Sequence, residues 1–178
     1  MKANILLILL SSLGLLPPSG LYSLQFTTLE GNNKSMQDFQ GKKLLVLVLP
    51  VTNSSADSTF LHKVDSFSRR YVDSVTFVGV PAQEFGYQAA KAGALLSYYR
   101  GILGPQVWLS QGMFVERASG SRQSALFSWL THSDQNLQFD QEVKGVGQKY
   151  FIDGSGNLYG VLSAAVTLRD SLFLKMLY

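Results

Sequence analysis

Two short apolar runs stand out in the first half of the chain. Residues 44–49 read LLVLVL and residues 75–80 read VTFVGV, and a proline follows each run, Pro50 and Pro81. Nearly continuous apolar runs of this length are typical of strands that are buried on both faces of a sheet. The two runs therefore predict the central strands of a sheet that is covered by helices on both sides.

Apolar positions recur every three to four residues in the segment between these runs. Within residues 57–72, one apolar face is formed by Phe60, Val64, Phe67 and Tyr71. This spacing predicts an amphipathic helix. Polar residues at its start can accept hydrogen bonds from the first free backbone N–H groups, and the candidates for the cap are Ser55, Asp57 and Ser58.

The rest of the chain alternates between strand-like and helix-like segments. Further strands are predicted at 22–28, 107–109, 148–152 and 158–162, and further helices at 88–100, 121–130 and 167–177. The last two strands are joined by the sequence DGSGN, which has the composition of a hairpin turn. The order of the elements predicts one α/β domain over residues 21–178 with a thioredoxin-like fold, in which helices flank a central mixed β-sheet and an extra strand precedes it.

Residues 1–20 have the composition of an export signal. Lys2 is followed by the uncharged run 5–16 and by the breaker segment 17–20, which reads PPSG. The run is shorter than the roughly 20 residues that a transmembrane helix needs, and no cysteine follows it that could carry a lipid. We therefore expect this signal peptide to be removed and the product to be secreted or periplasmic, without a stable membrane span. The alternative is an ordinary buried N-terminal helix.

Composition narrows the chemistry that the chain can support. Its 178 residues include no cysteine and only two histidines, His62 and His132. The lack of cysteine excludes disulfides, thiolate metal sites and thiol catalysis, and the scattered acids predict no metal site and no bound cofactor. The net charge is +3, and the cations are spread along the chain rather than clustered. We therefore expect no nucleic-acid partner.

Four segments resemble, in order, the motifs of the glutathione peroxidases. Residues 45–59 are similar to a strand followed by N-V-A-S-x-C-G-x-T, and residues 75–88 to a strand that leads into F-P-C-N-Q-F-G and a later glutamine. Residues 123–131, QSALFSWLT, resemble H-P-L-F-K-W-L-T, and residues 149–156, KYFIDGSG, resemble K-F-L-V-D-R-x-G. The resemblance implies the glutathione-peroxidase-like topology of the thioredoxin fold for essentially all of residues 21–178.

The residues that reduce peroxide in that family are replaced at each matching position. Ser55 stands where the resemblance implies the peroxidatic cysteine, and a serine hydroxyl cannot pass through the oxidation states of a thiol. Glu84 stands at a glutamine, and Gly145 and Val146 stand at a tryptophan–asparagine pair, so the amide and indole donors are lost. These four residues are predicted to be the degenerate remnant of a peroxidase site, with no catalytic residue among them.

Two of these residues have a second interpretation. A serine at a helix start can be a nucleophile with His62 and Asp65 as partners, but these two residues lie along the same helix, which favours a capping role for Ser55. Glu84 is either a solvated loop residue or, together with Ser55, part of a remnant pocket that holds a polar ligand.

The sequence thus predicts an exported protein that has lost thiol peroxidase activity and acts as a non-catalytic binding or interaction module. Its partner would be a small polar ligand or another protein. The alternatives are an enzyme of a different class that uses the remnant pocket, or a protein with a purely structural role. Such an enzyme would need an acid and a base that converge, and the sequence reveals no such pair.

Overall fold

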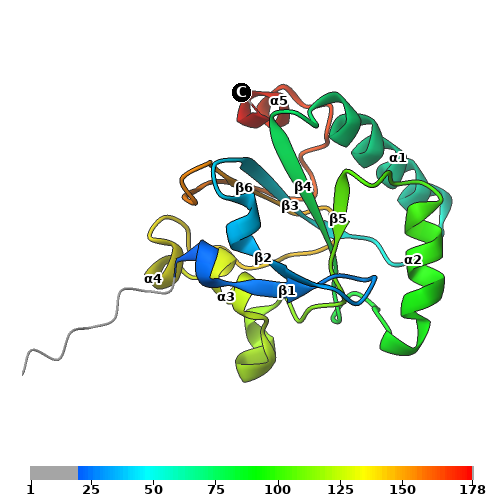
Figure 1. The fold of residues 1–178 in the computed structure, drawn as a ribbon, viewed down its shortest axis with the longest axis horizontal. Helices are drawn as coiled ribbons and strands as arrows, with labels where there is room; N and C mark the ends of the chain where they lie inside the picture. The colour runs from blue at the N-terminus through cyan, green and yellow to red at the C-terminus, as the bar shows by residue number, and fades with distance from the viewer. Residues whose placement is uncertain (1–19, 178) are drawn as a thin grey trace, which may run out of the picture.

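The computed structural model describes residues 20–177, which are built around a five-stranded sheet (Figure 1). The strand order is β5-β4-β3-β6-β7. Strands β3, β4 and β5 run parallel, β6 is antiparallel to β3, and β7 is antiparallel to β6. The strands are β3 (Lys43–Leu49), β4 (Val75–Pro81), β5 (Val107–Leu109), β6 (Lys149–Ile152) and β7 (Leu158–Leu162). The predicted α/β class with a central mixed sheet is confirmed.

Helices cover both faces of this sheet. The α-helices are α1 (Ser55–Arg70), α2 (Ala92–Arg100), α3 (Ala125–Thr131), α4 (Ser133–Asn136) and α5 (Ser171–Leu177). The 3-10 helices are η1 (Leu21–Ser23), η2 (Met36–Phe39), η3 (Ala89–Lys91) and η4 (Arg117–Arg122). Helices α1, α2 and α5 lie on one side of the sheet, and α3 lies on the other side together with the N-terminal segment (Figure 1).

The side chains of β3 alternate between two hydrophobic cores. Leu44, Val46 and Val48 pack with the N-terminal segment and α3 on one face. The intervening residues Leu45, Leu47 and Leu49 pack with α1, α2 and α5 on the other face. All six side chains are buried, which is why no polar residue interrupts this strand.

The strand predicted at 22–28 is wrong in its extent. The helix η1 takes its first residues, and only β1 (Gln25–Thr27) is a strand. It pairs antiparallel with β2 (Asn33–Ser35) in a separate two-stranded sheet. The segment that follows β1 nevertheless reaches the central sheet, because the Leu29 N–H donates to the Leu109 carbonyl of β5 at 2.9 Å.

The predicted helices are present, but several of their ends are displaced. The helix expected at 88–100 is divided into η3 and α2. The one expected at 121–130 begins at Ala125, because Ser124 caps α3 by accepting a hydrogen bond from the Phe127 N–H at 3.3 Å. The last helix, expected from residue 167, begins at Ser171.

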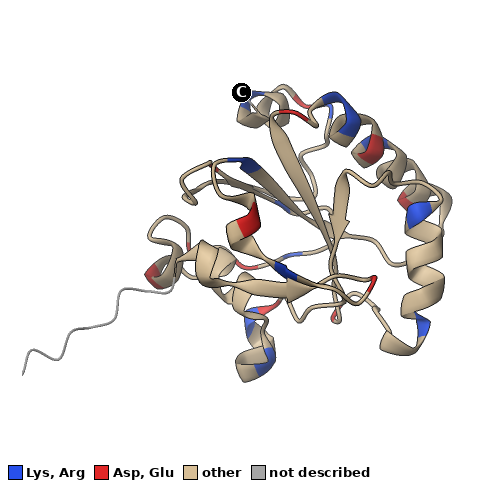
Figure 2. Cartoon of the chain, viewed as in Figure 1, with Lys and Arg blue, Asp and Glu red and all other residues tan. Residues whose placement is uncertain are grey.

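The predicted export signal lies outside the described residues except for Gly20. Within residues 20–177, no helix is long and apolar enough to cross a membrane. Figure 2 shows Lys and Arg on many different elements of the described chain, with Asp and Glu among them. This distribution gives no support to a nucleic-acid surface.

Candidate functional site

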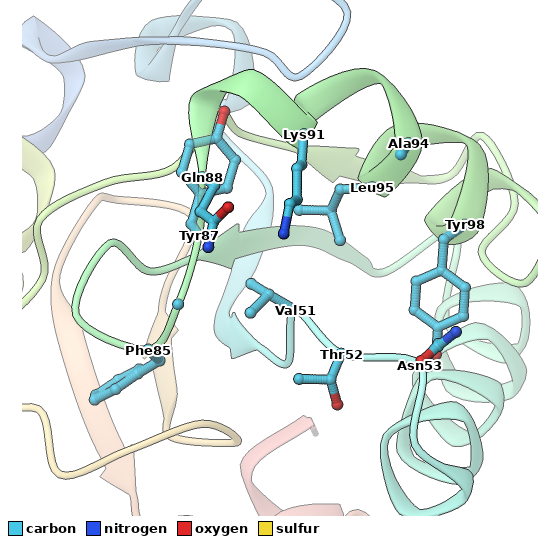
Figure 3. Close-up of a pocket in the computed structure, with 11 residues that line it drawn as sticks. Val51, Thr52, Asn53, Phe85, Tyr87, Gln88, Lys91, Ala94, Leu95 and Tyr98 are labelled. Carbon is cyan, nitrogen blue, oxygen red and sulfur yellow. The ribbon is translucent and has the colours of Figure 1, made fainter.

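A cavity of about 440 Å³ opens at the carboxyl ends of β3 and β4 (Figure 3). Its walls come from the β3–α1 loop, from the loop after β4, and from η3 and α2. The lining residues are Val51, Thr52, Asn53, Phe85, Gly86, Tyr87, Gln88, Lys91, Ala94, Leu95 and Tyr98. Open α/β sheets bind ligands beyond the carboxyl ends of their parallel strands. The cavity is therefore the candidate binding site.

The β3–α1 loop is held in place by the first turn of α1. Ser54 caps this helix, and its hydroxyl accepts a hydrogen bond from the Asp57 N–H at 3.1 Å. The Thr52 hydroxyl donates to the Asp57 carboxylate. These two contacts fix the loop from both ends of Asn53, so that side of the cavity is preformed.

Two consecutive tyrosines attach α2 to the same region. The buried Tyr99 hydroxyl donates to the Pro50 carbonyl at 2.7 Å, and burial raises the pKa of Tyr99, which keeps the hydroxyl protonated. The hydroxyl of Tyr98 is hydrogen-bonded to the Ser58 hydroxyl at 3.0 Å. The wall formed by α2 is thereby linked both to the end of β3 and to α1.

Glycine at two positions shapes the wall formed by the loop after β4. Gly86 has a φ of +99°, a backbone conformation that residues with a Cβ rarely adopt. Gly112 leaves room for the buried ring of Tyr87, since a Cβ at that position would lie 1.9 Å from the ring atom Cδ1. The position of Tyr87 in the cavity wall thus depends on a glycine from a distant segment.

Lys91 carries the one formal charge among the residues that line the cavity. Its side chain reaches across the opening, so that its nitrogen lies between Gln88 and Leu95 (Figure 3). Among the described residues, the ion pairs join other cations to acids, and no carboxylate pairs with Lys91. The cavity therefore combines apolar and aromatic walls with one cation and the neutral amides of Asn53 and Gln88.

Ser55 is the first residue of α1 and is exposed, but it does not line the cavity. The predicted cap is wrong by one residue, because the preceding Ser54 has the extended backbone and accepts the capping hydrogen bond. Asp65, the acid considered for a hydrolytic triad, accepts hydrogen bonds from the Gly104 N–H at 2.9 Å and from the Gln106 side chain at 3.0 Å. Its other carboxylate oxygen pairs with Arg69, so Asp65 is not oriented toward Ser55.

Glu84 has a role that neither interpretation of the sequence anticipated. Its carboxylate accepts hydrogen bonds from the Val115 and Glu116 N–H groups at 3.0 and 3.1 Å, and from the Ser119 hydroxyl at 2.6 Å. Burial raises the pKa of Glu84, but these donors lower it by more, so its pKa lies below the ordinary glutamate value. Glu84 is therefore neither a solvated loop residue nor part of the cavity wall. It fastens the loop after β4 to the segment that enters η4.

Gly145 and Val146 belong to the loop that precedes β6. The adjacent Gly147 N–H donates to the Val48 carbonyl at 2.7 Å, which places this loop beside the carboxyl end of β3. The loop thus lies at the same edge of the sheet as the start of α1. Neither Gly145 nor Val146 lines the cavity. The interpretation of these positions, with Ser55 and Glu84, as remnants of a peroxidase site stays a prediction.

The sequence analysis missed the residues that define the cavity. Lys91, Leu95 and Tyr98 recur at helical spacing within the predicted helix 88–100, so one face of that helix could have been singled out. The signal was ambiguous, because an apolar stripe at this spacing also fits ordinary core packing. Among residues 20–177, no group of three or more His, Asp or Glu side chains could hold a metal ion.

The element order, the mixed sheet and the site at its carboxyl edge define a thioredoxin-like fold. Similar solved structures include GPX1 of T. cruzi, with a TM-score of 0.62 and 14% identity over 89% of this chain and 96% of that one. A thioredoxin family thiol:disulfide interchange protein from Chlorobium tepidum has a TM-score of 0.57 and 19% identity over 90% of this chain and 94% of its own. The exposed lipoprotein thioredoxin Etrx1 of Streptococcus pneumoniae has a TM-score of 0.55 and 16% identity over 86% of this chain and 96% of its own.

These similarities confirm the predicted thioredoxin-like fold and the structural resemblance to glutathione peroxidases. No family model matches the sequence, and no curated protein matches it. At identities this low the likeness concerns the fold, and the function has to be argued from the site.

Proposed function

We propose that this protein is an exported, non-catalytic binding module that holds a small molecule in the cavity at the carboxyl edge of its sheet. One observation carries the proposal: the cavity lies at the usual ligand edge of the fold, yet its wall contains no Cys, His, Asp or Glu. Its volume of about 440 Å³ is typical of small-molecule sites. The cavity thus has the size and place of a binding site, and its wall lacks the thiol of the related enzymes and the His, Asp and Glu side chains that commonly serve in acid–base catalysis.

The chemistry of the fold's relatives cannot operate in this chain. Peroxide reduction and disulfide exchange both require a thiolate, and the chain has no cysteine. A hydrolase that used Ser55 with His62 as its base would need a third group to orient that base. The candidate acid Asp65 is already bound to Gly104, Gln106 and Arg69.

The test of this part is an assay of the purified protein with hydrogen peroxide or a lipid hydroperoxide, and with glutathione or thioredoxin as the electron donor. We expect no turnover above the buffer control. Thiol-dependent turnover that copurifies with the protein, at a constant activity for each milligram of it, would contradict the proposal. A cysteine-containing glutathione peroxidase in the same buffers is the positive control.

Export rests on residues 1–20, where Lys2, the uncharged run 5–16 and the breaker PPSG have the composition of a cleaved signal. One protein of similar fold is an exposed lipoprotein, so the scaffold occurs outside the cytoplasm. N-terminal sequencing of the exported material should show cleavage near residue 20. Leu9→Arg, which interrupts the apolar run, should retain the protein in the cell, whereas Ser12→Ala should not. Exported protein with an intact Met1 would overturn the cleaved signal.

A further inference from the structure

The charge on the cavity wall restricts the kind of ligand that it can hold. Two cations flank α2: Lys91 precedes its first residue at the cavity, and Arg100 is its last residue, outside the cavity wall. Arg100 is neutralised by Glu30 at 2.6 Å. Lys91 has no such partner among the described residues, and no acid lines the cavity. An uncompensated ammonium group at the rim favours an anion and disfavours a cation.

The part of the wall next to Lys91 is largely aliphatic and aromatic, which suits an apolar body. Val51, Leu95 and the ring of Tyr98 lie below and beside the Lys91 nitrogen (Figure 3). The amide of Gln88 lies on its other side and can donate a second hydrogen bond. The donors of Lys91 and Gln88 thus lie together at one end of the cavity, next to aliphatic and aromatic groups, while Thr52 and Asn53 lie on the far side near Tyr98 (Figure 3).

A single lysine fits a monoanion better than a phosphate group. A phosphate group carries up to two negative charges and three acceptor oxygens, so its sites typically gather several donors. The cavity offers one ammonium group and neutral amides. These donors match the two oxygens of one carboxylate.

We propose that the cavity binds a small monocarboxylate with an apolar, preferably aromatic, body. The carboxylate accepts hydrogen bonds from the Lys91 ammonium and the Gln88 amide, and the body packs against Val51, Leu95 and Tyr98. This assignment rests on the proposed binding function and names the class of ligand for the same cavity.

Three compounds with the same body separate the charge from the apolar contact. The probes are 4-phenylbutyrate, 4-phenylbutan-1-ol and 4-phenylbutylamine, titrated into the isotopically labelled protein while backbone amide NMR signals are followed. We expect the amide signals of four cavity residues to shift: Thr52, Asn53, Gly86 and Gln88. We expect the carboxylate to bind about tenfold more tightly than the alcohol, because one charge-assisted hydrogen bond at an exposed rim strengthens binding by about this factor. The amine should bind more weakly than the alcohol.

Variants assign the preference to Lys91. Lys91→Met should bring the affinity for 4-phenylbutyrate down to that for the alcohol and leave the affinity for the alcohol unchanged. Lys175→Met, which removes an exposed lysine of α5 outside the cavity, should leave all three affinities unchanged. Ala94→Phe, which adds a ring to the cavity wall, should weaken all three compounds.

The outcomes separate this assignment from the proposed function. If the alcohol and the carboxylate bind equally in the cavity, or if Lys91→Met keeps the preference, the carboxylate assignment is wrong while the binding module stands. If none of the three compounds shifts these amides, or if Ala94→Phe leaves their binding unchanged, the cavity is not a site for ligands of this kind. The proposed function then loses its site as well.

Discussion

Lys149, the first residue of β6, is a buried cation that makes the free energy of unfolding depend on pH. Its side chain is 1% exposed. The ammonium group donates to the carbonyls of Gly147 at 2.6 Å, Ser163 at 3.2 Å and Val166 at 2.6 Å. Burial lowers the pKa of Lys149 to about 8 from the ordinary value of 10.5, although the nearby charge of Asp170 partly offsets this effect. The folded protein therefore releases this proton more readily than the unfolded chain does.

The sign and size of the effect follow from this difference in pKa. Below pH 8 both states hold the proton, so Lys149 adds no slope to the stability curve. Between about pH 8 and pH 10.5 the unfolded chain holds more protons, so the free energy of unfolding rises with pH. At 1.36 kcal/mol for each unit of pKa, the full rise is about 3 kcal/mol, of which roughly 2 kcal/mol falls between pH 8 and pH 10.

Buried tyrosines set the upper end of this window. Burial raises the pKa of Tyr99 and Tyr150 above the ordinary value of 10.0, so the unfolded chain loses these protons first. The free energy of unfolding should therefore fall again above about pH 10. The sequence predicts neither limb of this curve, because both depend on burial.

Urea unfolding at pH 7, 8, 9 and 10 measures the rise directly. Lys149→Met keeps a side chain of similar length but cannot titrate, so the rise in stability with pH should disappear and only the fall caused by the tyrosines should remain. Lys175→Met, an exposed lysine, should keep the rise. A curve that is flat for the unaltered protein, or equally steep for Lys149→Met, would refute the reasoning.

Three further predictions concern the core and two positions, Glu84 and Ser55, that the sequence resemblance singled out. Val46→Ala and Phe77→Ala should each lower the free energy of unfolding by about 2–4 kcal/mol in urea melts, because both side chains are fully buried. Losses below about 0.5 kcal/mol, the size typical of surface sites, would exclude a buried sheet. Glu84→Gln should lower the free energy of unfolding by about 1–3 kcal/mol, because the amide cannot accept all the hydrogen bonds that the carboxylate accepts. The control Glu116→Gln should change it little, and equal urea midpoints for the two variants would contradict this prediction. Ser55→Cys should not give efficient peroxide turnover, because Gly145 and Val146, which the sequence resemblance places at the tryptophan and asparagine donors of glutathione peroxidases, have no side-chain donor. Turnover approaching that of a cysteine-containing peroxidase would show that those donors are dispensable.

The central strands could be predicted from the sequence because their environment is uniform along their length. The run at 44–49 became β3 (Lys43–Leu49), and the run at 75–80 became β4 (Val75–Pro81). A strand buried on both faces has to be apolar at every position, so the pattern and the structure coincide. The extent of the N-terminal strand was predicted wrongly, because its length is set by pairing with β2. Strand β2 reads NKS, a polar sequence that does not indicate a strand.

The site was less predictable because it is assembled from segments that are distant in the chain. The role of Glu84 depends on hydrogen bonds from Val115 and Ser119, which lie about 30 residues later in the chain. The sequence around Glu84 contains no pattern that indicates this contact. Lys91 and Tyr98 lie on a helix that was predicted, but only its contact with the β3–α1 loop decides which face borders the cavity. The family resemblance directed attention to Ser55, which proved to lie beside the cavity wall rather than in it.

The strand order also determines when the sheet can be completed during synthesis of the chain. Strand β3 has β4 on one side, which follows after a single helix, but its other neighbour β6 comes on the order of 100 residues later. Until residue 149 has been made, one edge of β3 is unpaired, and that strand reads KLLVLVL. An apolar strand with a free edge is a template for pairing with other chains. The centre of this fold is therefore completed late in synthesis, and its most apolar strand is the one that waits longest for its second partner.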